Sequence, residues 1–205
     1  MTHTLHRQGD SETLNNDFIL LAMPAKGYNK SGSREKLLQI IDICIKHNCI
    51  NIGDTQQGNM HSIGVENLKK RIRDGGVLNA LFSSRDNLIA ALKEVKAVDN
   101  GMSVVVTGLF EHTKECCKQA ELPRHTIASA VGILGKTELL PDHEHLSIMT
   151  MCGHALVTAA HIDFIVEEIK TGRMTLEEGG KELAKPCVCG IINPERTSQL
   201  LKEFL

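Results

Sequence analysis

Apolar runs and helical patterns alternate along the first two thirds of the chain. Each short, continuous apolar run is followed by a loop and then by a stretch with apolar residues at helical spacing. Because the runs are apolar throughout, they predict strands that are covered on both faces, as in a mostly parallel sheet with flanking helices. The predicted strands are 18–23, 49–53, 77–82 and 102–107, and the helices that follow them are 34–47, 63–73, 86–98 and 111–120.

The pattern changes near residue 140. A fifth strand is predicted at 126–134, and from Pro141 onward the sequence is helical. Thr175 with Glu178 has the spacing of a capping box, and Asn193-Pro194 has the form of a helix start. We therefore predict an α/β fold with a mostly parallel sheet of four or five strands and a short C-terminal helical segment that carries a Cys/His cluster. The predicted divisions are a flexible tail at 1–16, an α/β domain at 17–140, and a helical segment at 141–205 docked on that domain.

Composition and charge exclude several classes of protein. The 205 residues are 41% hydrophobic and 23% charged, with a formal net charge of −2 and no basic stripe, so nucleic-acid binding is not expected. No apolar run approaches the roughly 20 residues of a membrane-spanning helix, and the first residues lack the pattern of a secretion signal. We expect a cytoplasmic protein, in which seven cysteines indicate metal binding, catalysis or burial rather than disulfides.

The last third of the chain gathers thiols and imidazoles. Cys152-Gly-His154 and Cys187-Val-Cys189 form two short clusters of soft or borderline ligands, which suit zinc, copper or an iron–sulfur cluster. Gly190 permits the turn that Cys187 and Cys189 need to reach one ion. Cys152 is predicted to lie just before a long helix at 155–170, whose positive dipole end would favour its thiolate. These four residues are the predicted metal site, with an iron–sulfur cluster or zinc as the cofactor.

The remaining cysteines are expected to matter less. Cys116 and Cys117 are adjacent in a predicted helix, so at most one of them can face a site near Cys152. Cys44 and Cys49 are flanked by isoleucine and are predicted to be core residues.

Polar loops follow the predicted strands. In a parallel sheet the loops at the carboxyl ends of the strands form one crevice, which would bring Asp54, Thr55 and Arg85 together as binding residues for a small molecule. His112 is expected at the same edge of the sheet. The alternative interpretation of the loop at Asp54 is a rigid turn that binds no ligand. Neither a P-loop nor a dinucleotide-binding glycine pattern is present.

Three functional hypotheses follow. The first is a metal-binding α/β protein, as an enzyme with redox or Lewis-acid chemistry on a small metabolite or with the ion as a structural staple. The second is a thiol enzyme with Cys152 as nucleophile and Cys187 or Cys189 resolving a disulfide. The third is a regulatory domain that binds a small molecule and has structural cysteines. A homo-oligomer is compatible with all three, since parallel sheets often bury an edge in a dimer.

Overall fold

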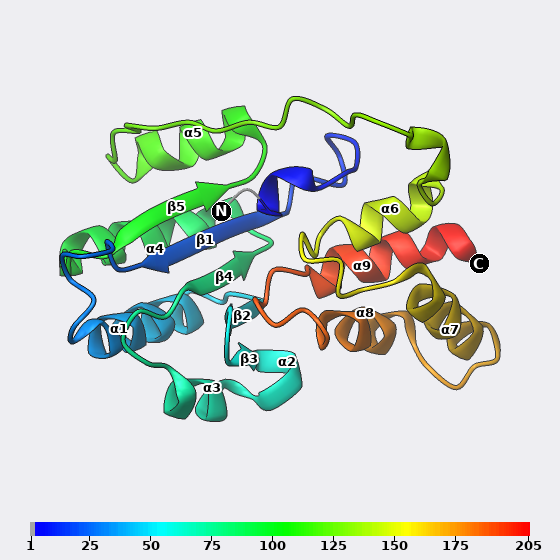
Figure 1. The fold of residues 1–205 in the computed structure, drawn as a ribbon, viewed down its shortest axis with the longest axis horizontal. Coiled ribbons are helices and arrows are strands. Elements are labelled where there is room, and N and C mark those ends of the chain that lie inside the picture. The colour runs from blue at the N-terminus through cyan, green and yellow to red at the C-terminus, as the bar shows by residue number, and fades with distance from the viewer. Residues whose placement is uncertain (1–2) are drawn as a thin grey trace.

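The computed structural model describes residues 3–205, and in this part of the chain five strands form one sheet. Each strand is short and almost entirely apolar or amide-bearing, which suits a sheet covered on both faces. The spatial order is β3-β2-β4-β1-β5 (Figure 1). The strands are β1 (Phe18–Met23), β2 (Asn51–Asp54), β3 (Gly58–Asn59), β4 (Leu78–Phe82) and β5 (Ser103–Thr107).

The prediction of a mostly parallel sheet is wrong, because every pair of neighbouring strands is antiparallel. β4 pairs antiparallel with both β1 and β2, and β5 pairs antiparallel with β1. β1 and β2 therefore run in the same direction, as a strand–helix–strand unit requires, but β4 lies between them. In the same way, β4 and β5 run in the same direction and β1 lies between them. Two interleaved split β-α-β units result, which is the ferredoxin-like arrangement, with β3 added at one edge.

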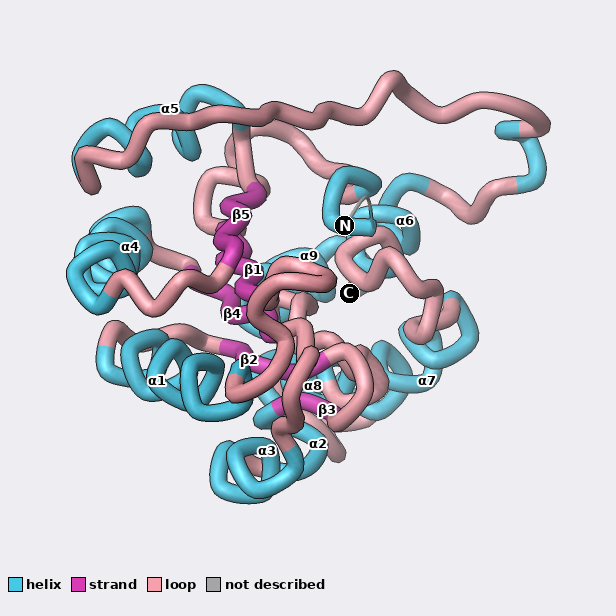
Figure 2. Tube along the Cα trace, turned by 60° about the vertical axis from the view of Figure 1, so that its left-hand side comes forward, coloured by secondary structure: helices cyan, strands magenta, loops and turns pink. Residues whose placement is uncertain are grey.

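Helices cover both faces of the sheet, as the continuous apolar runs indicate. In Figure 2, α1 and α4 lie on one side of the strands, and α6 and α7 lie on the other. The predicted helices at 34–47, 86–98 and 111–120 and the two capped helices of the last third are present. The predicted helix at 63–73 is shorter, because Gly64 separates a helix at 65–71 from a four-residue helix at 60–63. The helices are α1 (Ser33–Lys46), α2 (Met60–Ile63), α3 (Val65–Arg71), α4 (Arg85–Val98), α5 (Phe110–Gln119), α6 (His143–Met149), α7 (Ala159–Lys170), α8 (Leu176–Ala184) and α9 (Pro194–Leu200).

The alternation of side chains along the strands divides the core in two. On the first face, Phe18, Leu20 and Ala22 of β1 pack with α1 and α4. On the second face, Ile19 of β1 and Leu81 of β4 pack with α6 to α9. The second core contains the cysteines at 152, 187 and 189, so the segment 141–205 places its thiols against the sheet.

The predicted fifth strand at 126–134 does not form. This stretch is extended and solvent-exposed, with Val131 89% and Leu134 83% accessible. It connects α5 to α6 across the top of the molecule in Figure 1. Apolar, β-branched residues predicted a strand there, but a strand requires a hydrogen-bonding partner, and within residues 3–205 the edge next to β5 is not paired with this segment.

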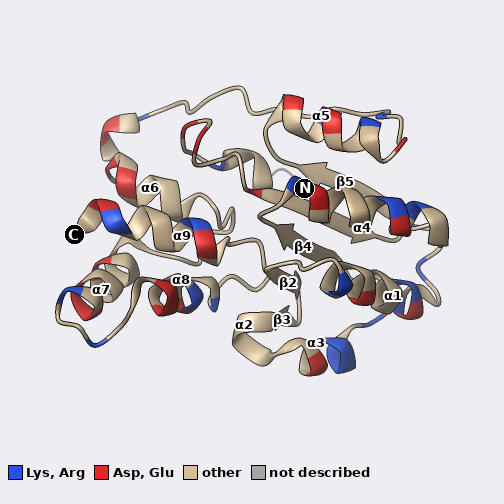
Figure 3. Ribbon diagram, turned by 180° about the vertical axis from the view of Figure 1, so that it is seen from behind, with Lys and Arg blue, Asp and Glu red and all other residues tan. Residues whose placement is uncertain are grey.

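The surface carries charges of both signs. Figure 3 shows Lys and Arg interspersed with Asp and Glu along the helices on both faces of the sheet. Among the helices of the described residues, none is long and apolar enough to cross a membrane.

Candidate metal centre

The four residues predicted as metal ligands lie together on the second face of the sheet. Cys152 follows α6, whereas Cys187 and Cys189 lie in the loop between α8 and α9. The Cys187 thiol is hydrogen-bonded to the thiols of both Cys152 and Cys189, and Cys189 Sγ lies 3.2 Å from His154 Nδ1. The three cysteines are buried and His154 is exposed. The arrangement is thus a buried row of three thiols that ends at an imidazole on the surface.

Two glycines allow the loop of Cys187–Gly190 to rest directly on β2. A Cβ added to Gly53 would lie 2.8 Å from the carbonyl carbon of Cys189 and 2.8 Å from the amide nitrogen of Gly190. A Cβ added to Gly190, whose φ is +69°, would lie 2.6 Å from the amide nitrogen of Gly53. All three distances are shorter than real Cβ contacts, so side chains at either position would push the cysteine loop off the sheet.

Two buried asparagines hold the ends of the same loop. Asn59 Nδ2 donates to the carbonyl oxygen of Cys187 at 2.7 Å and to that of Ala184 at 3.1 Å. Asn51 Nδ2 donates to the carbonyl oxygen of Ile192 at 2.9 Å. Sequence reasoning missed these residues, although asparagine is depleted in strands and an asparagine within an apolar strand is therefore a signal. Their amides fix the loop that carries Cys187 and Cys189.

Backbone amides surround the sulfur atoms. The N–H groups of His154 and Leu156 donate to Cys152, and the N–H group of Ile191 donates to Cys187. Each of these bonds lowers the pKa of the thiol that accepts it. N–H groups directed at sulfur are the usual outer partners of metal-bound thiolates, because they stabilise the negative charge that the ligand carries.

The prediction that a helix N-terminus favours the thiolate of Cys152 is wrong, because the pKa of this thiol is raised. The hydrogen bond to Cys187 raises this pKa most, and burial raises it further. Cys152 also does not lie next to α7, which begins at Ala159; its own N–H donates to the carbonyl of Met149 at the end of α6. A helix C-terminus disfavours a thiolate. The thiol whose pKa is lowered is Cys189, mainly through its hydrogen bond to Cys187.

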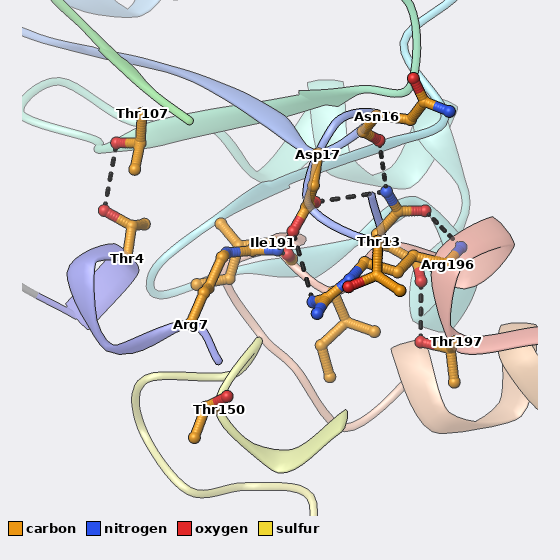
Figure 4. Close-up of polar contacts among 12 residues, drawn as sticks. Thr4, Arg7, Thr13, Asn16, Asp17, Thr107, Thr150, Ile191, Arg196 and Thr197 are labelled. Carbon is orange, nitrogen blue, oxygen red and sulfur yellow. Dashed lines mark hydrogen bonds and ion pairs between the residues drawn. The ribbon is translucent and has the colours of Figure 1, made fainter. Parts of the chain in front are cut away.

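A buried network joins the N-terminal segment to both cysteine loops (Figure 4). Arg7 forms an ion pair with Asp17 and donates to the carbonyl oxygen of Ile191, two residues after Cys189. Gln8 N donates to Thr150 Oγ1 at 2.9 Å, two residues before Cys152. Arg196 completes the network, since its Nη1 lies 3.6 Å from Asp17 Oδ2 and its Nη2 donates to the carbonyl oxygen of Gln8 at 2.6 Å. Arg7 and Gln8, which belong to the predicted tail at 1–16, are therefore bonded to residues beside the site.

The thiols and the imidazole form a row rather than a closed shell. Within residues 3–205, no group of three or more His, Cys, Asp or Glu side chains is arranged so that it encloses a common ion position. Thiols that share hydrogen bonds turn toward one another, whereas a bound ion requires them to turn toward one centre.

The predicted small-molecule site at Asp54, Thr55 and Arg85 loses its shared edge because the sheet is antiparallel. Asp54 pairs with Leu78 at the start of β4, whereas Arg85 follows the far end of that strand. Asp54 accepts hydrogen bonds from the N–H groups of Gln56 and Val77, and Thr55 N donates to the Val77 carbonyl, so both support the loop. Burial raises the pKa of Asp54.

Arg85 forms a separate contact at the opposite end of β4 from Asp54. Its Nη2 donates to Asn15 Oδ1 at 2.6 Å and lies 2.8 Å from His112 Nε2, so the predicted proximity of Arg85 and His112 is confirmed. Burial and the Arg85 charge lower the pKa of His112.

The other cysteines lie away from the candidate centre. Cys44 and Cys49 are buried in the first core, as predicted, and Cys116 is buried there too.

A hollow of about 320 Å³ lies between α2, α8 and α9, and it is lined by His61, Lys181 and Glu195 among others. Lys181 is already paired with Glu177 at 2.6 Å, and His61 is bonded to the Ile50 carbonyl at 3.1 Å. The hollow therefore offers less distinctive chemistry than the thiol row.

Comparisons of the chain with protein-family models, with curated proteins and with solved structures returned no match.

Proposed function

We propose that this protein binds one thiophilic metal ion, with Zn²⁺ as the best fit, through Cys152, Cys187, Cys189 and His154. The supporting observation is the row of contacts from Cys152 to Cys187, to Cys189 and to His154. In a tetrahedral site, these three neighbouring pairs would form three of the six edges. Zinc–sulfur bonds of about 2.3 Å put neighbouring sulfurs about 3.8 Å apart and put sulfur and imidazole nitrogen about 3.5 Å apart.

The contacts between thiols favour a single ion over a four-iron cluster. In a four-iron cluster, each cysteine binds a different iron, and the ligand sulfurs are spread around the whole cluster. Here Cys187 is hydrogen-bonded to both of the other thiols, which suits sulfurs that share one small cation. The N–H groups of His154, Leu156 and Ile191 supply the outer hydrogen bonds that such thiolates require.

A metal at this position would join the loop of Cys152 and His154 to the loop of Cys187 and Cys189. His154 and Cys189 are 35 residues apart in the sequence. Three thiolates and one imidazole complete the four-coordinate shell of structural zinc. His154 is the exposed ligand, so it is the one that water or a substrate could replace. Replacement of His154 would open the ion to Lewis-acid chemistry on a small metabolite.

Titration of the reduced, metal-free protein with Co²⁺ tests this proposal. Cobalt replaces zinc in tetrahedral thiolate sites, and its visible spectrum reports both geometry and sulfur ligation. We expect one equivalent to produce thiolate-to-cobalt charge-transfer bands and intense tetrahedral d–d bands, and Zn²⁺ to bleach them. Cys187→Ser and Cys189→Ser should each weaken binding by more than about 100-fold, which exceeds the loss caused by an outer-shell partner.

Cys117→Ser is the matched control, because Cys117 is a partly exposed thiol on α5, outside the second core. Its spectrum and affinity should equal those of the wild type. A wild-type protein that folds and gives no tetrahedral cobalt spectrum would contradict the proposal.

A second candidate function rests on the lowered pKa of Cys189 and its contact with Cys187. In thiol–disulfide exchange, the Cys189 thiolate would attack a substrate disulfide and release one thiolate. Cys187, after losing its proton, would then attack the mixed disulfide, so that the substrate leaves as a second thiol and the protein retains a disulfide. Limiting alkylation followed by mass mapping separates the two functions, since this chemistry requires selective labelling of Cys189 in metal-free protein.

A further inference from the structure

Asn79 has a buried side-chain amide that stabilises no other part of the described fold through a hydrogen bond. Its side chain has no solvent exposure, and neither Nδ2 nor Oδ1 has a hydrogen-bond partner among residues 3–205. Buried polar groups in proteins are nearly always paired, because an unpaired amide loses its hydration and gains nothing in return. An unpaired amide at the centre of a sheet therefore indicates a partner that the polypeptide itself does not supply.

The register of the sheet places Asn79 beside the cysteine loop. Asn79 lies opposite Leu21 on β1 and opposite Gly53 on β2. It shares the second face with Leu81, which is two residues along β4 and packs in the core that contains the three cysteines. The backbone of Cys189 and Gly190 rests on Gly53. The Asn79 side chain is consequently a direct neighbour of the turn that carries Cys187 and Cys189.

The other asparagines of this face show what its amides do. Asn51 and Asn59 each donate Nδ2 to backbone carbonyls of the cysteine loop or its continuation. Asn79 makes no such bond, although it is paired with Gly53, which the turn covers. A carboxamide carries two N–H donors, and a thiolate is a stronger acceptor than a thiol.

We propose that Asn79 is a positioning residue of the metal site, which donates Nδ2–H to the thiolate of Cys189 when the ion is bound. This inference rests on the proposed function. It assigns the unpaired donor a partner that becomes a strong acceptor when Cys189 binds the ion as a thiolate. Asn79 thereby favours the bound state at the expense of the metal-free fold.

The substitution Asn79→Leu tests this role, because leucine has the same branching of heavy atoms and no polar group. If Asn79 is a positioning residue, its replacement should raise the melting temperature of the metal-free protein; if it is a structural residue, the replacement should lower it. We expect the metal-free variant to melt about 2–4 °C higher than the metal-free wild type, since an unpaired amide is removed. The variant's Kd for Co²⁺ should nevertheless rise about 10- to 100-fold, as for other outer-shell partners. Asn79→Ser, which is smaller and retains a donor, should bind Co²⁺ with intermediate affinity.

Leu21→Val is the control, because Leu21 is the buried neighbour of Asn79 on the same face and has no donor. It should lower the melting temperature and leave the Kd for Co²⁺ unchanged. If wild type binds Co²⁺ and Asn79→Leu binds it equally well, the inference is wrong and the proposed metal site stands. A metal-free Asn79→Leu that melts below the wild type would also overturn it, because the amide would then be a structural group with a bound water as partner. If wild type does not bind Co²⁺, both proposals fail.

Discussion

At the scale of single residues, the candidate site depends on contacts that leave no space for a Cβ atom. Gly53 and Gly190 meet backbone to backbone, and Gly190 also has a positive φ of 69°. The two requirements can be separated, since Gly172 has almost the same φ, 73°, and faces open space. Gly190 and Gly172 thus differ in packing but have nearly the same φ.

Gly190→Ala is expected to destabilise the protein more than Gly172→Ala. Both substitutions place a side chain in the left-handed region, at a cost of about 1–2 kcal/mol. Only the first adds a clash with β2, which costs about a further 1–3 kcal/mol. Urea unfolding of the two metal-free variants measures the difference. Equal losses of stability would show that the cysteine loop does not rest on Gly53.

The sequence could predict the four candidate ligands, because the residue types and their clustering carry the chemistry. It could not predict the environment of Cys152. The helix expected from residue 155 begins at Ala159, so Cys152 follows the C-terminal end of one helix instead of preceding the N-terminal end of another. The asparagines at 51, 59 and 79 were missed because their importance depends on which face of which strand they occupy, and this is set by the register.

At the scale of elements, the sequence predicts the order of strands and helices but not their neighbours. An apolar run such as Val104–Val106 fits a parallel or an antiparallel partner equally well. Insertion of β4 between β1 and β2 is decided by pairing between strands that are distant in sequence. The same insertion separates Asp54 from Arg85, which the parallel interpretation had placed at one edge. The second core could not be predicted either, since residues 141–205 had no defined face on which to dock.

One contact between elements makes stability depend on pH. His145 joins α6 to α7, with Nδ1 2.6 Å from Asp142 Oδ1 and Nε2 2.9 Å from Asp163 Oδ1. Burial alone would lower the pKa of His145, but the hydrogen bonds to Asp163 and Asp142 outweigh it and raise the pKa above 6.5. Since the folded protein holds this proton more tightly than the unfolded chain, the stabilisation is complete below about pH 6.5 and is lost as the pH rises through the folded pKa.

Thermal melting between about pH 5.5 and 8.5 tests this contact, on either side of the ordinary imidazole pKa. We expect the melting temperature of His145→Gln to fall less between these limits than that of the wild type. His125→Gln, in the exposed connection between α5 and α6, should follow the wild-type curve. A His145→Gln curve parallel to the wild-type curve would exclude His145 as the source of the pH dependence.

At the scale of the whole molecule, the two ends of the chain converge on the second face. The N-terminal segment contributes Arg7, β1 is preceded by Asp17, and α9 contributes Arg196, all with side chains at most 7% exposed. One carboxylate thus faces two guanidinium groups in a buried network. Because Arg7 also holds the Ile191 carbonyl, this network fixes the continuation of the cysteine loop.

Asp17→Asn is expected to destabilise the protein by about 3–5 kcal/mol, because two buried cations would lose their counter-ion. Arg7→Met should also speed the release of Co²⁺, since the loop after Cys189 would lose an anchor. Equilibrium unfolding and competition with a chelator measure the two effects. Glu168→Gln, which breaks an exposed pair with Arg173, is the control and should change neither quantity appreciably. Unchanged stability of Asp17→Asn would show that the network is not formed in solution.

The metal content of the protein, purified anaerobically without added metal or chelator, is the decisive measurement for the proposed zinc site. Elemental analysis combined with a labile-sulfide assay gives the identity of the metal and the number of ions per chain. We expect about one zinc per chain and no labile sulfide, with less than half of the zinc retained in Cys187→Ser. Folded protein without stoichiometric metal would rule out the proposed site, and iron with stoichiometric sulfide would rule out a single ion.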